Sequence, residues 1–201
     1  MIDVSYNNFS GGIPSFLRRM PGLRDIHLSG NPLGGLIPDF WDKLSGLESI
    51  GLSNANLAGR IPETMGKLKN LTYLALDRNR LLGTIPRNLG SLPGIYNMDL
   101  SGNLLTGPIP FSAEFIWRLG SKLQLKENPG LCVDADLGSL NVVVLNLSYC
   151  DEIYFSEPIA QEKHEVILKS AASTSVPAAW GILHLMLYVY VICVTSLLTA
   201  L

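Results

Sequence analysis

The stretch I-H-L-S-G-N-P-L-G-G-L-I-P, residues 26–38, carries the pattern that decides the fold. The same frame begins at Ile2, Ile50, Leu74 and Met98, so it recurs every 24 residues without a slip. Each copy has a glycine at the same place, followed two residues later by Ile-Pro. The glycines are Gly11, Gly35, Gly59, Gly83 and Gly107. Five aligned copies indicate a repeat protein.

Apolar residues at the start of the frame and two positions later predict a short β-strand in every copy. Ile26 and Leu28 share one face because side chains alternate along a strand. One coil cannot bury that face alone, so neighbouring coils must stack and their strands must form a parallel sheet. We therefore predict an α/β solenoid over residues 1–131, with this sheet on its concave side.

An asparagine five residues after the start of the frame predicts a ladder of inward-pointing side chains. Its amide can satisfy backbone groups of its own coil and of the adjacent coil. Ala55 takes this place in the third copy, and an unsatisfied buried backbone group there would cost roughly 1–3 kcal/mol unless water replaces the amide. We expect that coil to be the weakest. The ladder residues are Asn7, Asn31, Asn79 and Asn103.

The second half of each copy predicts the return path of the coil. Glycine allows backbone conformations closed to other residues, and proline fixes φ and donates no hydrogen bond. Apolar residues at a spacing of three follow, as in Leu89, Leu92 and Ile95. This spacing predicts short 3₁₀ or helical segments on the convex side.

The pattern L-x-x-L-x-x-L-x-L-S-x-N-x-L-x-G-x-I-P resembles the plant-specific leucine-rich repeats of receptor-like kinases and receptor-like proteins. The resemblance covers residues 1–131 and implies a right-handed superhelix. Residues 115–132, ending in N-P-G-L-C, are similar to the closing coil of the Piriformospora indica-insensitive group. The frame expected at Lys122 has moved to Leu123 in this coil. Members of the class carry a signal peptide and a cysteine-containing cap, so we expect further N-terminal sequence before Ile2.

Two cysteines bracket residues 132–150, which we interpret as a C-terminal cap. The run N-V-V-V-L-N-L from Asn141 predicts a last strand there. Cys132 and Cys150 would form a disulfide in an oxidising compartment, and the alternative is two buried thiols. Sequons for N-glycosylation, which would agree with secretion, occur at Asn8, Asn70 and Asn146.

The last part of the chain predicts a membrane attachment. Residues 151–179 are interpreted as a stalk and linker, and residues 180–201 form an apolar run. Small residues, a spacer and an apolar end are typical of a glycolipid-anchor signal, with Ser170 as the residue that would receive the lipid. The alternative is a hydrophobic transmembrane helix. No basic residue follows Leu201 and a histidine interrupts the run, which favours the anchor.

The composition argues against catalysis and against nucleic acid as a partner. There are 15 basic and 17 acidic side chains, giving a net charge of -2. The three cysteines lack the paired spacing of a zinc site, and no histidine has an evident catalytic partner. We therefore predict a protein that is not an enzyme and that uses no metal and no cofactor.

Outward-facing strand positions of successive coils predict a continuous concave surface for recognition. We interpret it as centred on Tyr73, Arg78, Tyr96 and Asp99, because aromatic and arginine side chains dominate many interfaces. The alternative is an ordinary solvated face of a sheet. The candidate residues are Asp25, His27, Glu48, Tyr73, Asp77, Arg78, Tyr96, Asn97 and Asp99.

The first functional hypothesis is a receptor-like protein without a kinase domain on the extracellular side of the plasma membrane. It would bind a protein or peptide and signal through a transmembrane co-receptor. The resemblance implies roles in defence, symbiosis or development. A second hypothesis is a secreted wall-associated protein resembling polygalacturonase inhibitors, which would have no use for the apolar tail. A third is a degenerate gene fragment whose product does not fold.

Overall fold

The computed structural model describes residues 1–137 and 145–150. The chain divides into two compact units, Met1–Ser156 and Glu157–Leu201. All described residues belong to the first unit, and the stalk, the apolar run and Ser170 lie outside them.

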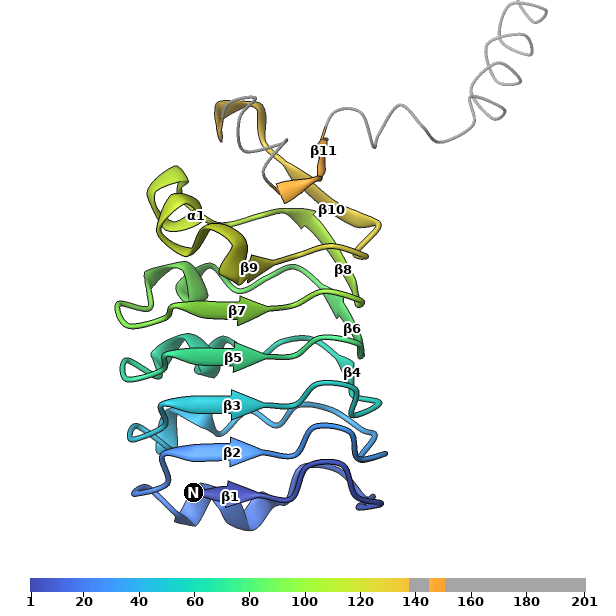
Figure 1. Ribbon diagram of the computed structural model, residues 1–201, viewed down its shortest axis with the longest axis vertical. Coiled ribbons are helices and arrows are strands. Elements are labelled where there is room, and N and C mark those ends of the chain that lie inside the picture. The colour runs from blue at the N-terminus through green and yellow to red at the C-terminus, as the bar shows by residue number, and fades with distance from the viewer. Residues whose placement is uncertain (138–144, 151–201) are drawn as a thin grey trace, which may run out of the picture. The chain divides into compact units, whose positions relative to one another are not determined.

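The apolar positions of the repeat form a six-stranded parallel sheet along one side of the stack (Figure 1). Each residue pairs with its equivalent in the next coil, as Ile26 does with Ile50 and Ile50 with Leu74. All three side chains are fully buried, because each coil covers the apolar face of its neighbour. In spatial order, the strands are β1 (Ile2–Asp3), β2 (Asp25–His27), β3 (Ser49–Gly51), β5 (Tyr73–Ala75), β7 (Asn97–Asp99) and β9 (Leu123–Gln124).

Short helices carry the chain along the convex side, as the spacing of three predicted. The proline of the repeat directly precedes three of them, and buried helix side chains such as Leu17, Trp41 and Leu89 point into the core. The 3₁₀ helices are η1 (Ser15–Arg19), η2 (Trp41–Lys43), η3 (Glu63–Lys67), η4 (Arg87–Ser91), η5 (Gly120–Lys122) and η6 (Ala135–Leu137), and α1 (Ala113–Leu119) is an α-helix.

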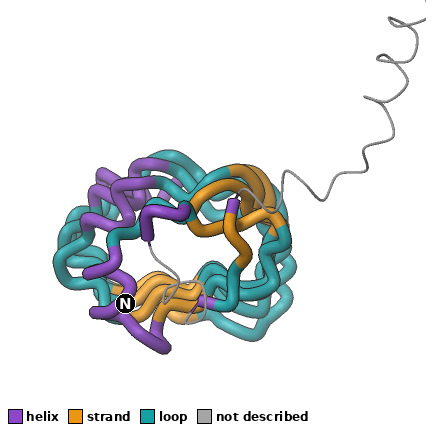
Figure 2. Tube along the Cα trace, turned by 90° about the horizontal axis from the view of Figure 1, so that it is seen from above, coloured by secondary structure: helices purple, strands orange, loops and turns teal. Residues whose placement is uncertain are grey.

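A second parallel sheet, which the sequence pattern did not predict, forms where each coil turns back. Viewed along the stack, strands lie on two sides of the coil and helices on another (Figure 2). Gly59 has a φ of +77°, a backbone conformation that residues with a Cβ rarely adopt, and Gly11, Gly35, Gly83 and Gly107 also have positive φ, so the turn of the coil requires glycine. In spatial order, the strands are β11 (Ser148–Tyr149), β10 (Gly130–Val133), β8 (Leu104–Pro108), β6 (Arg80–Gly83) and β4 (Ala58–Gly59).

Three of the four ladder asparagines are buried and join adjacent coils. Asn79 donates to the carbonyl oxygens of Leu52 and Leu76, and it accepts from the backbone N–H groups of Ala55 and Leu57. Asn31 and Asn103 are also buried and make the same kind of contacts.

The ladder differs from the prediction at both ends. Asn7 is exposed and donates to the carbonyls of Val4 and Ser5, as a ladder asparagine does within its own coil, but within the described residues it does not join two coils. The sequence reasoning also missed Asn128, which is buried and bonds to Leu100 and Leu105. Its position five residues after the shifted frame start was the signal that could have found it.

The break at Ala55 does not leave the unsatisfied backbone group that we expected. The N–H of Leu33, which a ladder asparagine at position 55 could have served, donates instead to the carbonyl of Asn31 at 2.8 Å. The carbonyls of Leu28 and Leu52 are served by the asparagines on either side, Asn31 and Asn79. A local turn satisfies the N–H group and the neighbouring asparagines satisfy the carbonyls, so these groups do not need an asparagine at position 55.

The C-terminal cap closes the second sheet. Leu123 pairs with Met98, which places the closing coil in the shifted frame. Cys132 and Cys150 form a disulfide that ties β11 to the sheet. The strand predicted from Asn141 is wrong for residues 145–147, which are not in a strand, and β11 begins only at Ser148. Residues 141–144 lie outside the described part.

Candidate functional site

The concave sheet presents two columns of outward side chains between its buried ones. The strand register places Tyr73 beside Asn97 and Ala75 beside Asp99, and it aligns Asp25 with Ser49 in the same way. These residues, with His27, are partly buried or, for Ala75, fully buried. The strands therefore bring together several of the residues that we predicted for recognition.

The ring of His27 lies against Gly51 of the next coil. A Cβ on Gly51 would lie 2.6 Å from Nδ1 of His27, so only glycine leaves room for the ring. Its Nε2 lies 3.1 Å from the hydroxyl of Ser49, and its ring centroid lies 6.4 Å from that of Tyr73. Gly51 and Ala75 are small and buried, so the column between His27 and Asp99 carries no large side chain.

Serine side chains hold two carboxylates on this face. The hydroxyl of Ser53, one coil away, donates to Asp77. Asp99 accepts from the hydroxyl of Ser101 at 2.6 Å and from its backbone N–H at 3.0 Å. Burial raises the pKa of the Tyr73 phenol above its ordinary value, and the nearby carboxylates of Asp77 and Asp99 raise it further.

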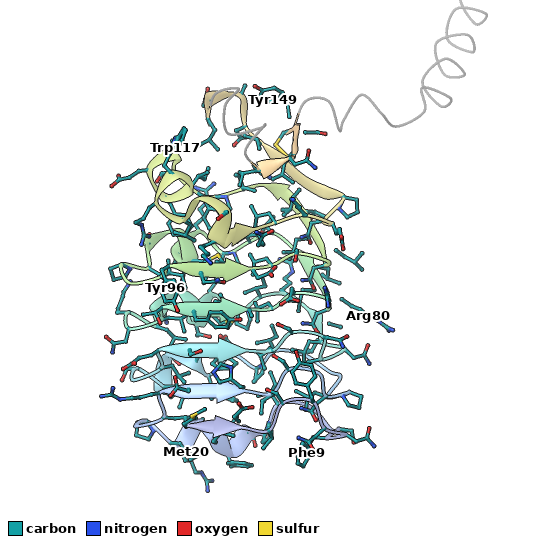
Figure 3. The ribbon with its side chains drawn as sticks, viewed as in Figure 1. Phe9, Met20, Arg80, Tyr96, Trp117 and Tyr149 are labelled. Atoms are coloured by element: carbon teal, nitrogen blue, oxygen red, sulfur yellow. A yellow bond between two sulfur atoms is a disulfide. The ribbon has the colours of Figure 1, made fainter. Side chains whose placement is uncertain are left out.

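Two of the predicted residues lie just before the strands. Tyr96 lies at the edge of the sheet where β7 begins (Figure 3) and is 59% exposed, so its ring is the most accessible aromatic side chain among the predicted residues. Glu48 is ion-paired with Arg24 at 3.0 Å, so its carboxylate already has a cationic partner. Tyr96 and Asp99 are therefore better candidates for contact with a ligand than Glu48.

A hollow of about 410 Å³ lies where the strands end, at the rim between the two sheets. Arg78 lies at this rim with a φ of +55°, and Asn54 and Asn56 have φ values of +49° and +54°. The Arg78 guanidinium is 4.0 Å from Asp77, and within the described residues Arg80 has no ion pair. The lining residues are Gly30, Asn31, Pro32, Asn54, Asn56, Arg78, Asn79 and Arg80.

Of the residues that line this hollow, the sequence predicted Arg78 for recognition and Asn31 and Asn79 for the ladder. The two exposed amides of Asn54 and Asn56 flank Ala55, so the interruption of the ladder places side chains with free hydrogen-bonding groups beside two arginines. Arg80 extends outward from β6 (Figure 3). The signal that could have found the site is the coincidence of the ladder break with the D-R-N-R sequence one coil later.

Comparison with known proteins decides the family. The profile described as Leucine Rich Repeat matches residues 1–20, 22–44 and 70–92. The BIR2 ectodomain from Arabidopsis thaliana is 31% identical, with a TM-score of 0.57, over 68% of this chain and 70% of BIR2. The chain belongs to the leucine-rich-repeat family. No curated protein matches it.

Other solved relatives of this leucine-rich-repeat protein are receptor ectodomains. The Arabidopsis receptor kinase HAESA, solved with an IDA peptide hormone, is 38% identical with a TM-score of 0.58 over 65% of this chain. A TDR receptor is 32% identical with a TM-score of 0.55 over 66% of this chain. The leucine-rich-repeat protein spans 21% of the HAESA ectodomain and 22% of the TDR receptor.

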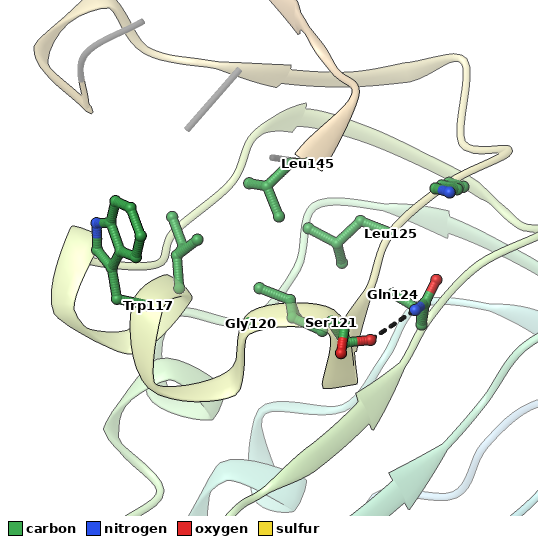
Figure 4. A pocket seen from close by; sticks show the side chains of 9 residues that line it. Trp117, Gly120, Ser121, Gln124, Leu125 and Leu145 are labelled. Atoms are coloured by element: carbon green, nitrogen blue, oxygen red, sulfur yellow. Dashed lines mark hydrogen bonds between the residues drawn. The ribbon is translucent and has the colours of Figure 1, made fainter. Parts of the chain in front are cut away.

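A pocket of about 280 Å³ lies at the closing coil of the leucine-rich-repeat protein, between α1 and Leu145 (Figure 4). Leu123, Leu125 and Trp117 line it, and Gln124 donates to the carbonyl of Ser121 at 2.7 Å. Its lining is largely apolar and includes one charged side chain, Lys126. The concave face combines charge, aromatic rings and hydrogen-bonding groups, and we therefore place the candidate site there.

The remaining predictions have different outcomes. The sequon asparagines Asn8, Asn70 and Asn146 are exposed, and the side-chain amide of Asn70 donates to Ser45 at 2.9 Å. Among residues 1–137 and 145–150, no helix is long and apolar enough to cross a membrane, and no three metal-binding side chains gather. The apolar run at 180–201 and Ser170 fall outside those residues.

Proposed function

We propose that this leucine-rich-repeat protein is the recognition part of a cell-surface receptor-like protein without a kinase domain. Its concave face between β3 and β7 binds a peptide or protein ligand, and a transmembrane co-receptor carries the signal. The observation that carries the proposal is the grouping of Tyr73, Tyr96, Asp77 and Asp99 on the concave face, where neighbouring coils bring two aromatic rings and two carboxylates together. It acts by binding and not by catalysis.

The solved relatives support this reading. HAESA is described in complex with the peptide hormone IDA and the co-receptor SERK1, and it is 34% identical with a TM-score of 0.58 in that structure. PEPR1 is described with AtPEP1, with 35% identity and a TM-score of 0.56. Receptor ectodomains of this kind work outside the cell, which supports a location on the extracellular side of the plasma membrane.

Photocrosslinking on the full chain tests the proposed surface. A photoreactive phenylalanine replaces Tyr96 on the concave face or, as the matched control, Trp117 on α1, because both side chains are 59% exposed. Incubation with secreted plant peptides should give a crosslinked peptide at position 96 and none at position 117. Equal labelling at both positions, or labelling at 117 alone, would show that the concave face is not the binding surface.

The mode of attachment to the membrane is tested on intact cells. We propose a glycolipid anchor added at Ser170, and a phosphatidylinositol-specific phospholipase should then release the protein into the medium. Retention of an accessible ectodomain, with a lipase-resistant anchor excluded by lipid labelling, would instead support a transmembrane helix at 180–201. A protein that never reaches the surface would contradict both.

A further inference from the structure

A row of basic side chains runs along the convex side of the first three coils. Arg19, Lys43 and Lys67 occupy the same position of the repeat, and they are the last residues of η1, η2 and η3. These helices pack side by side, η1 against η2 and η2 against η3, and all three basic side chains are exposed. Because neighbouring coils rise by about 5 Å, the cationic groups follow one another at about that spacing. We call these three residues the convex basic row.

The charges of the convex basic row are only partly neutralised. The carboxylate of Asp42 lies 3.8 Å from the ammonium group of Lys43 and 3.9 Å from that of Lys67, so two cations share one anion. Within the described residues, Arg19 has no ion pair, and neither have Arg18 and Lys69, which are exposed next to the row in sequence. Like charges at neighbouring positions repel one another, so the row gains from a further anion.

The 3₁₀ helices do not need these cations in order to end. A basic residue near the C-terminal end of a helix interacts favourably with the free carbonyl groups there. However, η4 is as long as η1 and η3, and it ends at the neutral residue Ser91, which occupies the position of Lys67 in the next coil. The backbone N–H after η4 still donates to the carbonyl of Leu89. The row therefore has no evident task within the fold.

The convex basic row is opposite in charge to the concave face. The chain as a whole has a net charge of -2, so the row is not part of a generally basic surface. Four carboxylates lie on the concave side, those of Asp25, Glu48, Asp77 and Asp99. A polyanion is therefore repelled from the concave face and attracted to the convex basic row.

The surroundings of the row favour a hydrated polymer over a lipid surface. Faces that bind membranes combine basic residues with exposed apolar side chains. Phe16 and Met20 are exposed beside Arg19, but the counterparts of Met20 in the next two coils, Leu44 and Leu68, are fully buried. The two lysines of the row therefore have no such apolar neighbours at this position.

We propose that the convex basic row binds an anionic polysaccharide that has one carboxylate on each sugar, a polymer of uronic acids. The polymer lies along the stack, and Arg19, Lys43 and Lys67 bind successive carboxylates, one from each coil. A sugar ring is about as long as the rise of one coil, so the two charge spacings match. The choice of this polymer rests on the extracellular location in the proposed function, whereas the position of the row does not.

Oligogalacturonates of increasing length test this inference on the full chain by isothermal titration calorimetry. Affinity should rise steeply until the oligomer covers three coils, at about three to four sugars, and only slowly beyond that length. Methyl-esterified oligomers of the same length have no charge and should bind at least tenfold more weakly. Equal affinity for both forms, or tighter binding to phosphatidylglycerol vesicles, would overturn the proposal.

Variants of the row test whether its register matters. The pair Lys43→Gln and Lys67→Gln should weaken binding about five- to tenfold, because two exposed ion pairs are lost. The control pair, Arg60→Gln and Lys122→Gln, removes the same charge from exposed residues elsewhere and should change the affinity less than twofold. Ser91→Lys adds a cation in register and should strengthen binding about threefold, with the levelling length increased by one sugar. Circular dichroism checks that each variant is folded.

Two results with these variants contradict the inference. Equal weakening by the two pairs would mean that the polymer responds only to net charge. A Ser91→Lys variant with unchanged affinity and unchanged length dependence would mean that the polymer does not follow the stack.

The convex basic row and the concave face lie on different sides of the coil, so their tests are independent. Oligogalacturonates should leave peptide labelling at position 96 unchanged. Labelling at 96 without any binding of oligogalacturonate overturns the convex site alone. Binding of oligogalacturonate by the row, without labelling at 96, supports the convex site and overturns the proposed recognition surface.

Discussion

Asn79 supports more backbone groups than the other ladder asparagines. It is 8% exposed, donates to Leu52, Leu76 and Asp77, and accepts from Ala55 and Leu57. The two acceptances matter most, because the coil that contains Ala55 has no ladder asparagine of its own. Loss of this amide leaves buried N–H groups of that coil without an acceptor.

We expect Asn79→Ala to lower the free energy of unfolding by about 3 kcal/mol, since several buried groups lose their partners at once. Asn7→Ala is the control, because Asn7 is exposed and bonds only within its own coil, and it should cost below about 1 kcal/mol. Urea unfolding followed by circular dichroism measures both. Equal costs would show that the ladder contributes no more in the buried coils than at the exposed end.

The raised pKa of Tyr73 predicts that the free energy of unfolding depends on pH in the alkaline range. Its pKa is raised in the folded state, above 10.0, first by burial and then by Asp77 and Asp99. The unfolded state therefore releases the phenolic proton at a pH where the folded state still holds it, and the free energy of unfolding falls as pH rises above about 10. Stability from this group is fully present below that pH.

The Tyr73 pKa should fall toward its ordinary value in Asp77→Asn, because one negative charge is removed, but it should stay raised, since burial remains. Carbon NMR of the tyrosine ring follows the ionisation of this residue directly. Asp134→Asn, at an exposed residue after β10, should leave it unchanged. A Tyr73 pKa that does not respond to Asp77 would mean that the carboxylate is directed away from the ring.

Among the structural elements, the concave strands and convex helices were predictable and the second sheet was not. Ile26 and Leu28 alternate with outward polar residues, so a period of two marks the strand. In β6 and β8 the outward side chains include Leu82 and Leu104 as well as Arg80, so no polar face alternates with an apolar one. That sheet results from stacking, which the glycines allow, and its strands have no pattern of their own.

In the candidate site, too, some features could be predicted from the sequence and others could not. The columns that bear Tyr73 and Asp99 follow from the repeat, because each coil repeats the register of the last. The bond from Ser53 to Asp77, the pairing of Glu48 with Arg24, and the hollow at the rim depend on the side chains of one particular neighbouring coil. A period of 24 residues predicts which positions meet, but not what their side chains do there.

The edge strand β11 depends on the disulfide between Cys132 and Cys150. β11 is two residues long and pairs only with β10 within the described residues, so backbone hydrogen bonds alone hold it weakly. Cys150→Ser should cost about 3 kcal/mol, the usual effect of closing a loop of this length, with a separation of 18 residues. Hydrogen exchange should accelerate at Tyr149 and stay slow in β5. Unchanged protection at Tyr149 would show that the strand is held by packing instead.

At the scale of the whole first unit, stability is shared between neighbouring coils, and the two ends of the stack differ. The closing coil has α1, the disulfide and β11 over the core. The first coil of the structure leaves large apolar side chains in water, and Figure 3 shows Phe9 and Met20 at that end. The exposed residues there are Met1, Tyr6, Phe9, Phe16 and Met20.

In the chain of residues 1–201, this apolar end, with the edge of β1 beside it, is expected to drive association between molecules, and a coil stacked before Ile2 would cover it. The double change Phe9→Ser and Phe16→Ser should therefore lower the concentration-dependent increase in sedimentation coefficient without altering circular dichroism. Trp117→Ser is the matched control, because Trp117 and Phe16 are both 59% exposed but Trp117 is the one large apolar side chain on the outer face of α1. If association falls equally in this variant and in Trp117→Ser, any exposed aromatic ring is enough to drive association. If association falls only in the Phe9→Ser and Phe16→Ser variant, the cause is the group of apolar residues at the first coil. Such a group is expected there, because the face that each coil of a stacked protein presents to the next coil is apolar.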